Sequence, residues 1–226
     1  MEKNKVNKVE LVYITPNAAQ KIESIACVCY DSEPTEDCKI FKGCMKSGHM
    51  SVAEHSDITF KVTCSRACSH QLVRHRTGKY TQRSQRYCKE DGFEYYTPDS
   101  IVANKCVHIY TEAMNLIQGY YDILIENGVP AEDARYVLPN ACETVLYITM
   151  DFRNFFHFLN ERLCTRAQKE IRDIAKEMAR LAVEACPIIK PYCVPKCESF
   201  SIAYCPEHKS CGRHKPLKEI VRDEYK

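Results

Sequence analysis

Three short stretches of the chain have the patterns of β-strands. Residues 58–63 alternate apolar and polar side chains, which is the period of a half-buried strand. Residues 143–150 are rich in Val, Ile, Thr and Tyr, and residues 9–14 form an apolar stretch that opens the chain. We therefore expect a small, mostly antiparallel sheet.

Longer stretches have helical periodicity and are punctuated by capping residues. Asn17, Ser65 and Asp151 are candidate N-caps, and Gly48 is a candidate stop. Gly128 and Pro130 end one helix and open the next. The expected helices cover residues 18–30, 36–47, 66–76, 107–127, 132–137, 152–163 and 165–185. In the third of these, Cys68, Leu72 and Val73 are expected to point inward, and residues 77–104 are expected to be irregular. A few strands among several helices predict an α+β fold.

Length and charge limit the possible classes of protein. A chain of 226 residues suits one sizeable domain. Its formal net charge is only +2, which argues against a dedicated nucleic-acid binder. No apolar run approaches the roughly 20 residues of a membrane span. Residues 1–5 lead into a short strand rather than into the apolar core of a signal peptide. We expect a cytoplasmic protein that binds neither membrane nor nucleic acid.

The chain carries 15 cysteines, an odd number with scattered spacing. Several lie within apolar patterns, where a free thiol packs as a small hydrophobe, so reduced cysteines are expected. Residues 191–226 form a tail rich in Cys and Pro beyond a domain over residues 1–190. Cys193, Cys197, Cys205 and Cys211 could form a four-thiolate zinc site, but their spacings are loose for one. We expect no metal, with the zinc site as the alternative.

The densest chemistry lies in residues 74–87, where four arginines, a lysine and a histidine alternate with hydroxyl, amide and tyrosine side chains. Guanidinium groups bind phosphate bidentately, so this cluster predicts an anionic ligand. A solvated basic loop or a nucleic-acid patch is the alternative. All seven glycines are isolated, and neither a Gly-x-Gly-x-x-Gly turn nor a Walker A loop is present. A bound dinucleotide would therefore need side chains or helix N-termini to hold its pyrophosphate.

The same segment resembles the signature of flavin-dependent thymidylate synthases, Arg-His-Arg-x-x-Ser-x-x-x-x-Ser-x-Arg-Tyr. Arg74-His75-Arg76, Ser84 and Arg86-Tyr87 match it, and Gln82 stands two residues before the second serine. Lys79 replaces the first serine, which puts that single contact in doubt.

Four further elements resemble the family in the same order. They are the Gly48–His55 segment, Gln71–Arg74, Gly128–Pro139 with its arginine at 135, and Asp151–Arg162. The resemblance covers roughly residues 8–190 and leaves the tail outside. It implies a homotetramer with shared active sites, which methylates dUMP to dTMP with FAD, methylenetetrahydrofolate and NADPH.

The resemblance also implies roles for individual residues. Arg162 would stabilise negative charge on the pyrimidine. The dUMP site would comprise Gln71, Leu72, Val73, Arg74, Gln82, Arg83, Ser84, Gln85, Arg86, Arg135 and Arg162. The FAD site would comprise His49, Ser51, Arg74, His75, Arg76, Gln82, Asp151, Arg153 and His157.

One geometric problem accompanies these roles. On a straight helix Arg153 and Arg162 would lie about 180° apart. Either the helix ends near Asn160, or its two faces serve different active sites of an oligomer. Two other functions stay open: a nucleic-acid-binding protein with a zinc-bearing tail, and a flavoprotein of different activity on the same scaffold.

Overall fold

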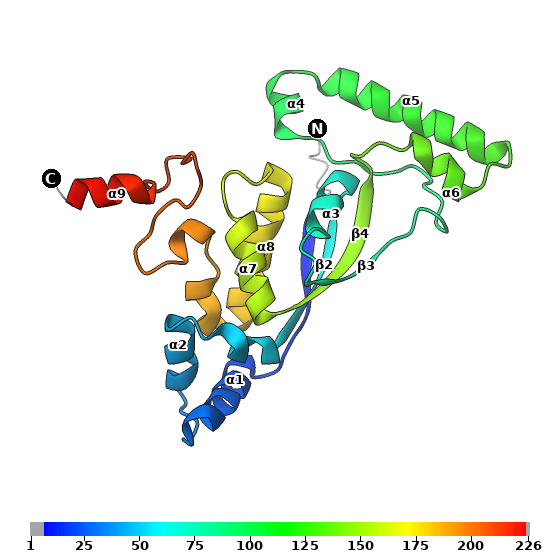
Figure 1. Ribbon diagram of the computed structural model, residues 1–226. Coiled ribbons are helices and arrows are strands. Elements are labelled where there is room, and N and C mark those ends of the chain that lie inside the picture. The colour runs from blue at the N-terminus through cyan, green and yellow to red at the C-terminus, as the bar shows by residue number, and fades with distance from the viewer. Residues whose placement is uncertain (1–6, 225–226) are drawn as a thin grey trace. The chain divides into compact units, whose positions relative to one another are not determined.

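The computed structural model describes residues 7–224 (Figure 1). The expectation for residues 1–5 therefore lies outside the described part of the chain. Two compact units are formed, and each consists of several segments. Among the described residues, unit 1 comprises 7–9, 61–74 and 80–148, and unit 2 comprises 10–60, 75–79 and 149–224.

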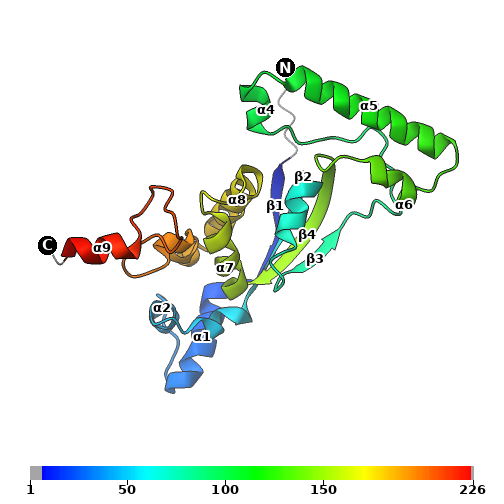
Figure 2. The ribbon, with the colours of Figure 1, turned by 45° about the horizontal axis from the view of Figure 1, so that its top comes forward.

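A four-stranded sheet has the order β1-β2-β4-β3 (Figure 2). The strands are β1 (Lys8–Ile14), β2 (Asp57–Ser65), β3 (Lys79–Gln82) and β4 (Glu143–Asp151). The pairing of β2 with β4 is antiparallel, because Phe152 N donates to Ser56 O (2.9 Å) at one end and Arg66 N donates to Cys142 O (2.9 Å) at the other. Both units contribute residues to each strand. The expected α+β class and small antiparallel sheet are confirmed.

The central strands alternate as their sequences predict. Ile58, Phe60, Val62 and Cys64 of β2 are completely buried, and the residues between them are partly exposed. In β4 the buried positions are Thr144, Leu146, Ile148 and Met150. Side chains of the two strands that point to one face therefore form the core, and β-branched residues suit this pleated surface.

Unit 1 carries α3 (Arg66–Leu72), α4 (Asp99–Ala103), α5 (Val107–Glu126), α6 (Ala131–Ala134) and the 3-10 turn η3 (Arg135–Val137). Helix α5 buries Met114 and Tyr121. It is tied to the preceding loop by Gln118, which accepts from Phe93 N (2.9 Å) and donates to Glu90 O (3.0 Å). This anchoring holds the long helix against the segment that follows the arginine cluster.

Unit 2 carries the helices α1 (Ala18–Cys27), α2 (Lys39–Lys46), α7 (Phe152–Arg162), α8 (Lys169–Ala185) and α9 (Leu217–Glu224), with 3-10 turns η1 (Val28–Tyr30), η2 (Met50–His55), η4 (Pro187–Tyr192) and η5 (Lys196–Glu198). Its core is aromatic. Phe155 of α7 packs on Phe60, with ring centroids 5.6 Å apart, and Phe156 packs on Tyr192, at 5.5 Å. Such pairs add about 0.5–1.5 kcal/mol beyond the burial of their area. Helix α7 is thereby held on both sides of its buried face.

Two predicted caps are confirmed. Ser65 Oγ accepts from Cys68 N (3.0 Å) at the start of α3, and Asp151 Oδ1 accepts from Asn154 N (2.8 Å) at the start of α7. Asn17 precedes α1 in a left-handed conformation and makes no side-chain cap. The expected capping role of Asn17 was therefore wrong.

Several expected boundaries were also wrong. Helix α2 begins at Lys39 rather than Glu36, α3 ends at Leu72 rather than Arg76, and α8 begins at Lys169 rather than Thr165. Val73, expected to point inward, is 37% exposed because it lies past the end of α3. The segment expected to be irregular contains β3 and α4.

The N-terminus of α2 is capped by a side chain from another helix. Glu23 of α1 is completely buried, and it accepts from Phe41 N (2.7 Å), Ile40 N (3.2 Å) and Thr35 Oγ1 (2.9 Å). A carboxylate at a helix N-terminus satisfies N–H groups that have no partner within the helix. Across residues 7–224, no helix has both the length and the apolar character needed to cross a bilayer.

Candidate active site

In unit 1, Gln82 at the end of β3 has its amide group fixed by two hydroxyl groups. Its Nε2 donates to Ser69 Oγ of α3 (3.0 Å) and to Thr144 Oγ1 of β4 (3.1 Å). Both hydroxyl-bearing residues are almost completely buried. With both N–H groups engaged, the amide presents its carbonyl oxygen Oε1 as the acceptor for a ligand.

The turn after β3 holds the next predicted residues. Ser84 Oγ accepts from Arg86 N (3.2 Å), and Ser84 O accepts from Cys88 N (3.0 Å), so the backbone folds back at this point. Arg83 forms an ion pair with Glu90, which is almost buried, and donates to Lys89 O (3.1 Å). The Glu90 carboxylate therefore holds the guanidinium group of Arg83 against the protein surface.

Arg86 and Arg135, which are far apart in sequence, meet at one residue. Arg86 Nε donates to Glu132 Oε2 (2.9 Å), and Arg135 Nε donates to Glu132 O (3.0 Å). Arg86 and Glu132 are about half exposed, so this pair contributes little to stability. Two guanidinium groups gathered at a solvent-accessible position form a suitable phosphate site.

Other residues predicted for the dUMP site have different environments. The side chain of Leu72 is completely buried, so contact with a ligand would fall to its backbone. Gln85 is almost buried, and its Nε2 lies 3.7 Å from Cys142 Sγ. Arg74 is exposed and lies beyond the end of α3, so it is not on the helix that carries Gln71.

In unit 2, a cavity of about 360 Å³ brings together three residues predicted for FAD, namely His49, Ser51 and Arg153. Gly48 precedes them with φ of +78°, a conformation that favours glycine. Arg153 forms an ion pair with Glu54, which orients its guanidinium group. The volume falls in the usual range for ligand pockets of roughly 300–1,000 Å³.

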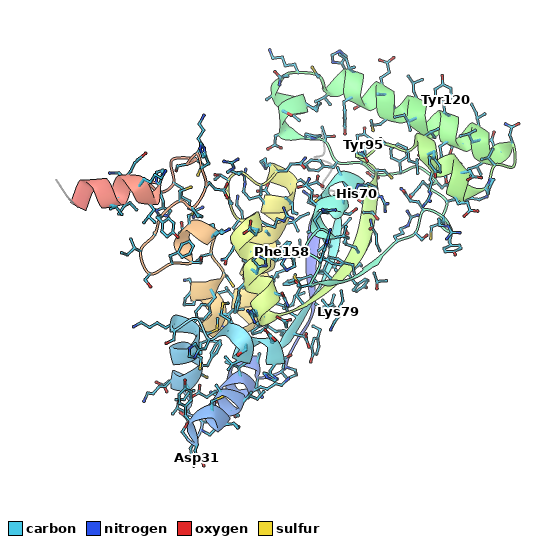
Figure 3. The ribbon with its side chains drawn as sticks, viewed as in Figure 1. Asp31, His70, Lys79, Tyr95, Tyr120 and Phe158 are labelled. Carbon is cyan, nitrogen blue, oxygen red and sulfur yellow. The ribbon has the colours of Figure 1, made fainter. Side chains whose placement is uncertain are left out.

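A second group of predicted residues gathers around His75. Its ring lies 5.2 Å from that of His157 and 5.6 Å from that of Phe158, which Figure 3 labels on α7. Thr77 Oγ1 lies 3.0 Å from His75 Nε2. Burial, followed by the charge of His157, lowers the pKa of His75, and Arg162 acts in the same direction. His75 is therefore neutral at neutral pH.

Helix α7 carries the remaining predicted residues. Arg153 and His157 lie four residues apart on one face of the helix, which connects the cavity with the histidine pair. The helix continues to Arg162 without interruption. The idea that it ends near Asn160 was therefore wrong, and the two arginines project from opposite sides.

Two groups in the unit 2 cavity had no signal in the sequence. Cys29 and Tyr30 line it because α1 gives way to the 3-10 turn η1, whereas an unbroken helix was expected here. Tyr30 is 55% exposed and offers an aromatic wall beside Arg153. A change of helix type at this position could not be recognised from apolar periodicity.

Comparisons with known proteins show the family to which the chain belongs. Residues 10–188 match the family model described as thymidylate synthase complementing protein. The flavin-dependent thymidylate synthase of Geobacter sulfurreducens is 38% identical over 96% of this chain and 98% of its own length. The enzyme of the same name from Clostridium tetani is also 38% identical, over 94% of this chain and 96% of its own.

A solved structure shares the fold. The UMP/dUMP methylase PolB of Streptomyces cacaoi, bound with 5-Br dUMP, superimposes with a TM-score of 0.71 at 24% identity. The match covers 82% of this chain and 93% of that one. Together with the family model and the two relatives, the arginine cluster and the ordered elements around it establish that this chain belongs to the flavin-dependent thymidylate synthases.

Proposed function

We propose that the two groups of side chains described above bind dUMP and FAD for the reaction of this family, the reductive methylation of dUMP to dTMP. The observation that carries this proposal is the gathering of His49, Ser51 and Arg153 around one cavity, with His157 further along α7 and His75 packed beside it. These residues come from distant parts of the chain, and the resemblance had assigned all of them to the flavin.

The residues of unit 2 fit a flavin dinucleotide. Arg153 supplies the positive charge that a pyrophosphate needs in a protein without a glycine-rich turn. Tyr30 and Met50 supply apolar wall, and Ser51 supplies a hydroxyl group. FAD bound here would supply the redox chemistry as the carrier of hydride. His75, whose pKa is lowered, and His157 beside it would orient the ligand by hydrogen bonding.

The residues of unit 1 fit a pyrimidine nucleotide. Arg86 and Arg135 converge at Glu132 and bind the phosphate. Gln82 offers an acceptor whose orientation Ser69 and Thr144 fix, and this suits a hydrogen-bond donor of the nucleotide. Ser84 is a binding residue rather than a nucleophile, because its hydroxyl group accepts from the backbone and no general base among the described residues contacts it. Fixed orientation of the nucleotide is itself a large contribution to rate.

Arg162 has the electrostatic role. A guanidinium group beside the ring stabilises the negative charge that develops when N3 loses its proton, and this increases electron density at C5. We expect Arg162→Ala to retain bound FAD and its yellow colour, and to lose turnover of dUMP. Arg76→Ala should instead lose flavin first.

The test measures flavin absorbance per chain and tritium release from C5-labelled dUMP for both variants. Arg180→Ala is the matched control, because Arg180 is an exposed arginine of α8 whose ion-pair partners among the described residues are Glu177 and Glu184. Loss of flavin in Arg162→Ala with dUMP binding intact would reject the role of Arg162. Unchanged flavin content in Arg76→Ala would reject that of Arg76.

The oligomer is a homotetramer with active sites shared between copies. Support comes from an exposed apolar stripe on α5, formed by Ile109, Leu116, Tyr120 and Ile123. Tyr120 is labelled in Figure 3, and Gly119 beside it leaves open space where a second helix can approach closely. Opposite faces of α7 that carry Arg153 and Arg162 also suit sites built from two copies.

Co-expression of Arg153→Ala with Arg162→Ala tests the sharing of sites. If each site takes these arginines from different copies, hybrid oligomers contain some sites with both arginines and regain activity. No regain in hybrids that light scattering shows to be tetramers would mean that each site takes both arginines from one copy. Methylenetetrahydrofolate is the carbon donor, NADPH is the reductant, and the 15 free thiols suit a reducing cytoplasm.

A further inference from the structure

The cysteine-rich tail forms an ordered loop beyond the residues that match the family model. It lies between α8 and α9 and is drawn in orange to red in Figure 1. Tyr204 N donates to Cys197 O (3.1 Å), and Cys205 N donates to Lys215 O (2.9 Å). Cys205 also pairs with Pro216 in an isolated β-bridge. The two ends of the loop are thereby brought together.

Inside this loop is a small cavity of about 20 Å³, enough for a single water molecule or ion. Five thiol or imidazole side chains line it: Cys164, Cys197, Cys205, Cys211 and His214. Four of them come from the loop, and Cys164 comes from the segment between α7 and α8. Cys193, which the spacing had grouped with Cys197, does not line this cavity.

The nearest atoms are already close to the spacing of metal ligands. Cys197 Sγ, a carboxylate oxygen of Glu198 and a ring nitrogen of His214 all lie within 4.8 Å of one another. Around a tetrahedral zinc ion, sulfur and nitrogen ligands lie about 3.5 Å apart. The Cys197 sulfur and the His214 ring nitrogen therefore lie within roughly 1.3 Å of the spacing that two zinc ligands need.

The role of Glu198 differs from that of the candidate ligands. Its Oε1 accepts from Arg213 Nε (2.5 Å) and lies 3.2 Å from His214 Nε2. A carboxylate that holds one nitrogen of a histidine leaves the other nitrogen for a metal. Glu198 is therefore an orienting group rather than a ligand. Gly212, with φ of +93°, lets the chain reverse between Cys211 and His214.

We propose that this cavity is a structural Zn²⁺ site, with Cys197 and three further ligands drawn from Cys164, Cys205, Cys211 and His214. Thiolate and imidazole ligands in a closed four-coordinate arrangement select zinc over magnesium or calcium. At least three of the ligands are thiolates. This differs from the sequence expectation of no metal. It also differs from the alternative set, because Cys164 and His214 are candidate ligands and Cys193 is not.

The site would fasten the tail to the end of α7. Cys164 follows Arg162 by two residues, and neighbouring contacts already join the two segments. Lys196 pairs with Glu161 (3.2 Å), and Asn160 Nδ2 donates to Val194 O (2.7 Å). An ion that bridges Cys164 to the loop would fix the helix end that presents Arg162.

The first experiment measures metal in the untagged holoenzyme by plasma mass spectrometry and by zinc X-ray absorption. We expect about one zinc per chain with mostly sulfur neighbours at about 2.3 Å. Differential alkylation with and without a strong chelator, followed by peptide mass spectrometry, then identifies the ligands. At least three of the four thiols should be labelled only after chelation, whereas Cys106 should be labelled equally in both.

Variants supply the second experiment. Cys197→Ser should lower zinc content at least tenfold and lower the melting temperature, and Cys106→Ser, at the start of α5, should change neither. Chelation of the wild-type enzyme should lower the melting temperature in the same way, which keeps the test valid if Cys197→Ser folds poorly. Zinc below a tenth of an equivalent, another stoichiometric ion at these thiols, or alkylation independent of chelator would overturn the proposal.

Discussion

The imidazole rings of His75 and His157 lie 5.2 Å apart, and the first of them is held in a partly buried position against Phe158. Two histidines this close repel each other when both are charged. The arrangement therefore favours a neutral His75 ring, which can donate and accept hydrogen bonds without adding positive charge to the arginines already present.

The first prediction concerns pH. Because the pKa of His75 is lowered, His75 is neutral in both the folded and the unfolded protein at pH values above its ordinary pKa of 6.5. In that range its titration does not change the free energy of unfolding. Below that value the unfolded chain takes up a proton that the native state resists, so stability falls as the pH falls. His75→Gln should weaken this loss, measured by urea unfolding at pH 7.5 and 5.5 with flavin content followed in parallel.

The groups that act on His75 define the control. They are His157, Arg162 and Asp151, together with the backbone of Asn154. His70→Gln, at an exposed histidine of α3 that Figure 3 labels, should keep the pH dependence of the wild type. Identical slopes for His75→Gln and wild type would contradict the expected burial of His75.

The second prediction concerns Glu23. Burial alone would raise its pKa, but hydrogen bonds from Phe41, Thr35 and Ile40 outweigh burial and lower it. Its contribution to stability is therefore present above the ordinary value of 4.5 and is lost as the pH falls through the lowered value. Glu23→Gln should cost about 1–3 kcal/mol at pH 7 and flatten the acid limb of the unfolding curve. The control Glu33→Gln, at an exposed glutamate, should change neither the stability at pH 7 nor the acid limb of the unfolding curve.

The third prediction concerns Gln82. Gln82→Ala removes the side-chain amide group. The N–H donors to Ser69 and Thr144 are then lost, together with the carbonyl acceptor proposed for the nucleotide. It should raise KM for dUMP about tenfold, the equivalent of one hydrogen bond of about 1.4 kcal/mol. Steady-state kinetics would measure it. Thr59→Val, which breaks the Thr59–Thr149 hydroxyl pair elsewhere in the sheet, should leave KM unchanged. An equal rise in both variants would point to damage to the sheet.

The fourth prediction concerns thiol reactivity. Burial raises the pKa of Cys142 to about 12 and that of Cys193 to about 12, so both keep their protons at pH 8. Cys29 and Cys88 are exposed and should be alkylated first. Timed labelling of the native protein with iodoacetamide and peptide mass spectrometry would test the order. Labelling of Cys142 as fast as that of Cys88 would show that the loop over β4 opens readily.

Much of the fold could be predicted where the determining interactions are local. Ser65 and Asp151 bond to N–H groups three residues ahead, and both caps were recognised. The short strand β3 was missed because its polar residues gain their conformation from pairing with β4, more than 60 residues away in sequence. The start of α2 was misplaced because Glu23, a residue of another helix, supplies its partners.

The candidate site also combines residues that the sequence identified with contacts that only the tertiary structure shows. The resemblance identified Arg86 and Arg135, but their convergence at Glu132 depends on a tertiary contact across 46 residues. Ser69 and Thr144, which fix Gln82, belong to no motif. Cys164 was absent from the cysteines that the spacing had grouped for the same reason. It is distant in sequence from the tail and lines the tail cavity only through folding.

Asp151 illustrates a limit on how mutational data for this enzyme should be interpreted. It is the last residue of β4, and both of its carboxylate oxygens are used by Asn154, through the backbone N–H (2.8 Å) and through Nδ2 (2.6 Å). Substitution by alanine would therefore release the junction from which Arg153, His157 and Arg162 all project. A colourless Asp151→Ala protein would indicate misalignment of an entire helix, and it would not identify Asp151 as a flavin ligand.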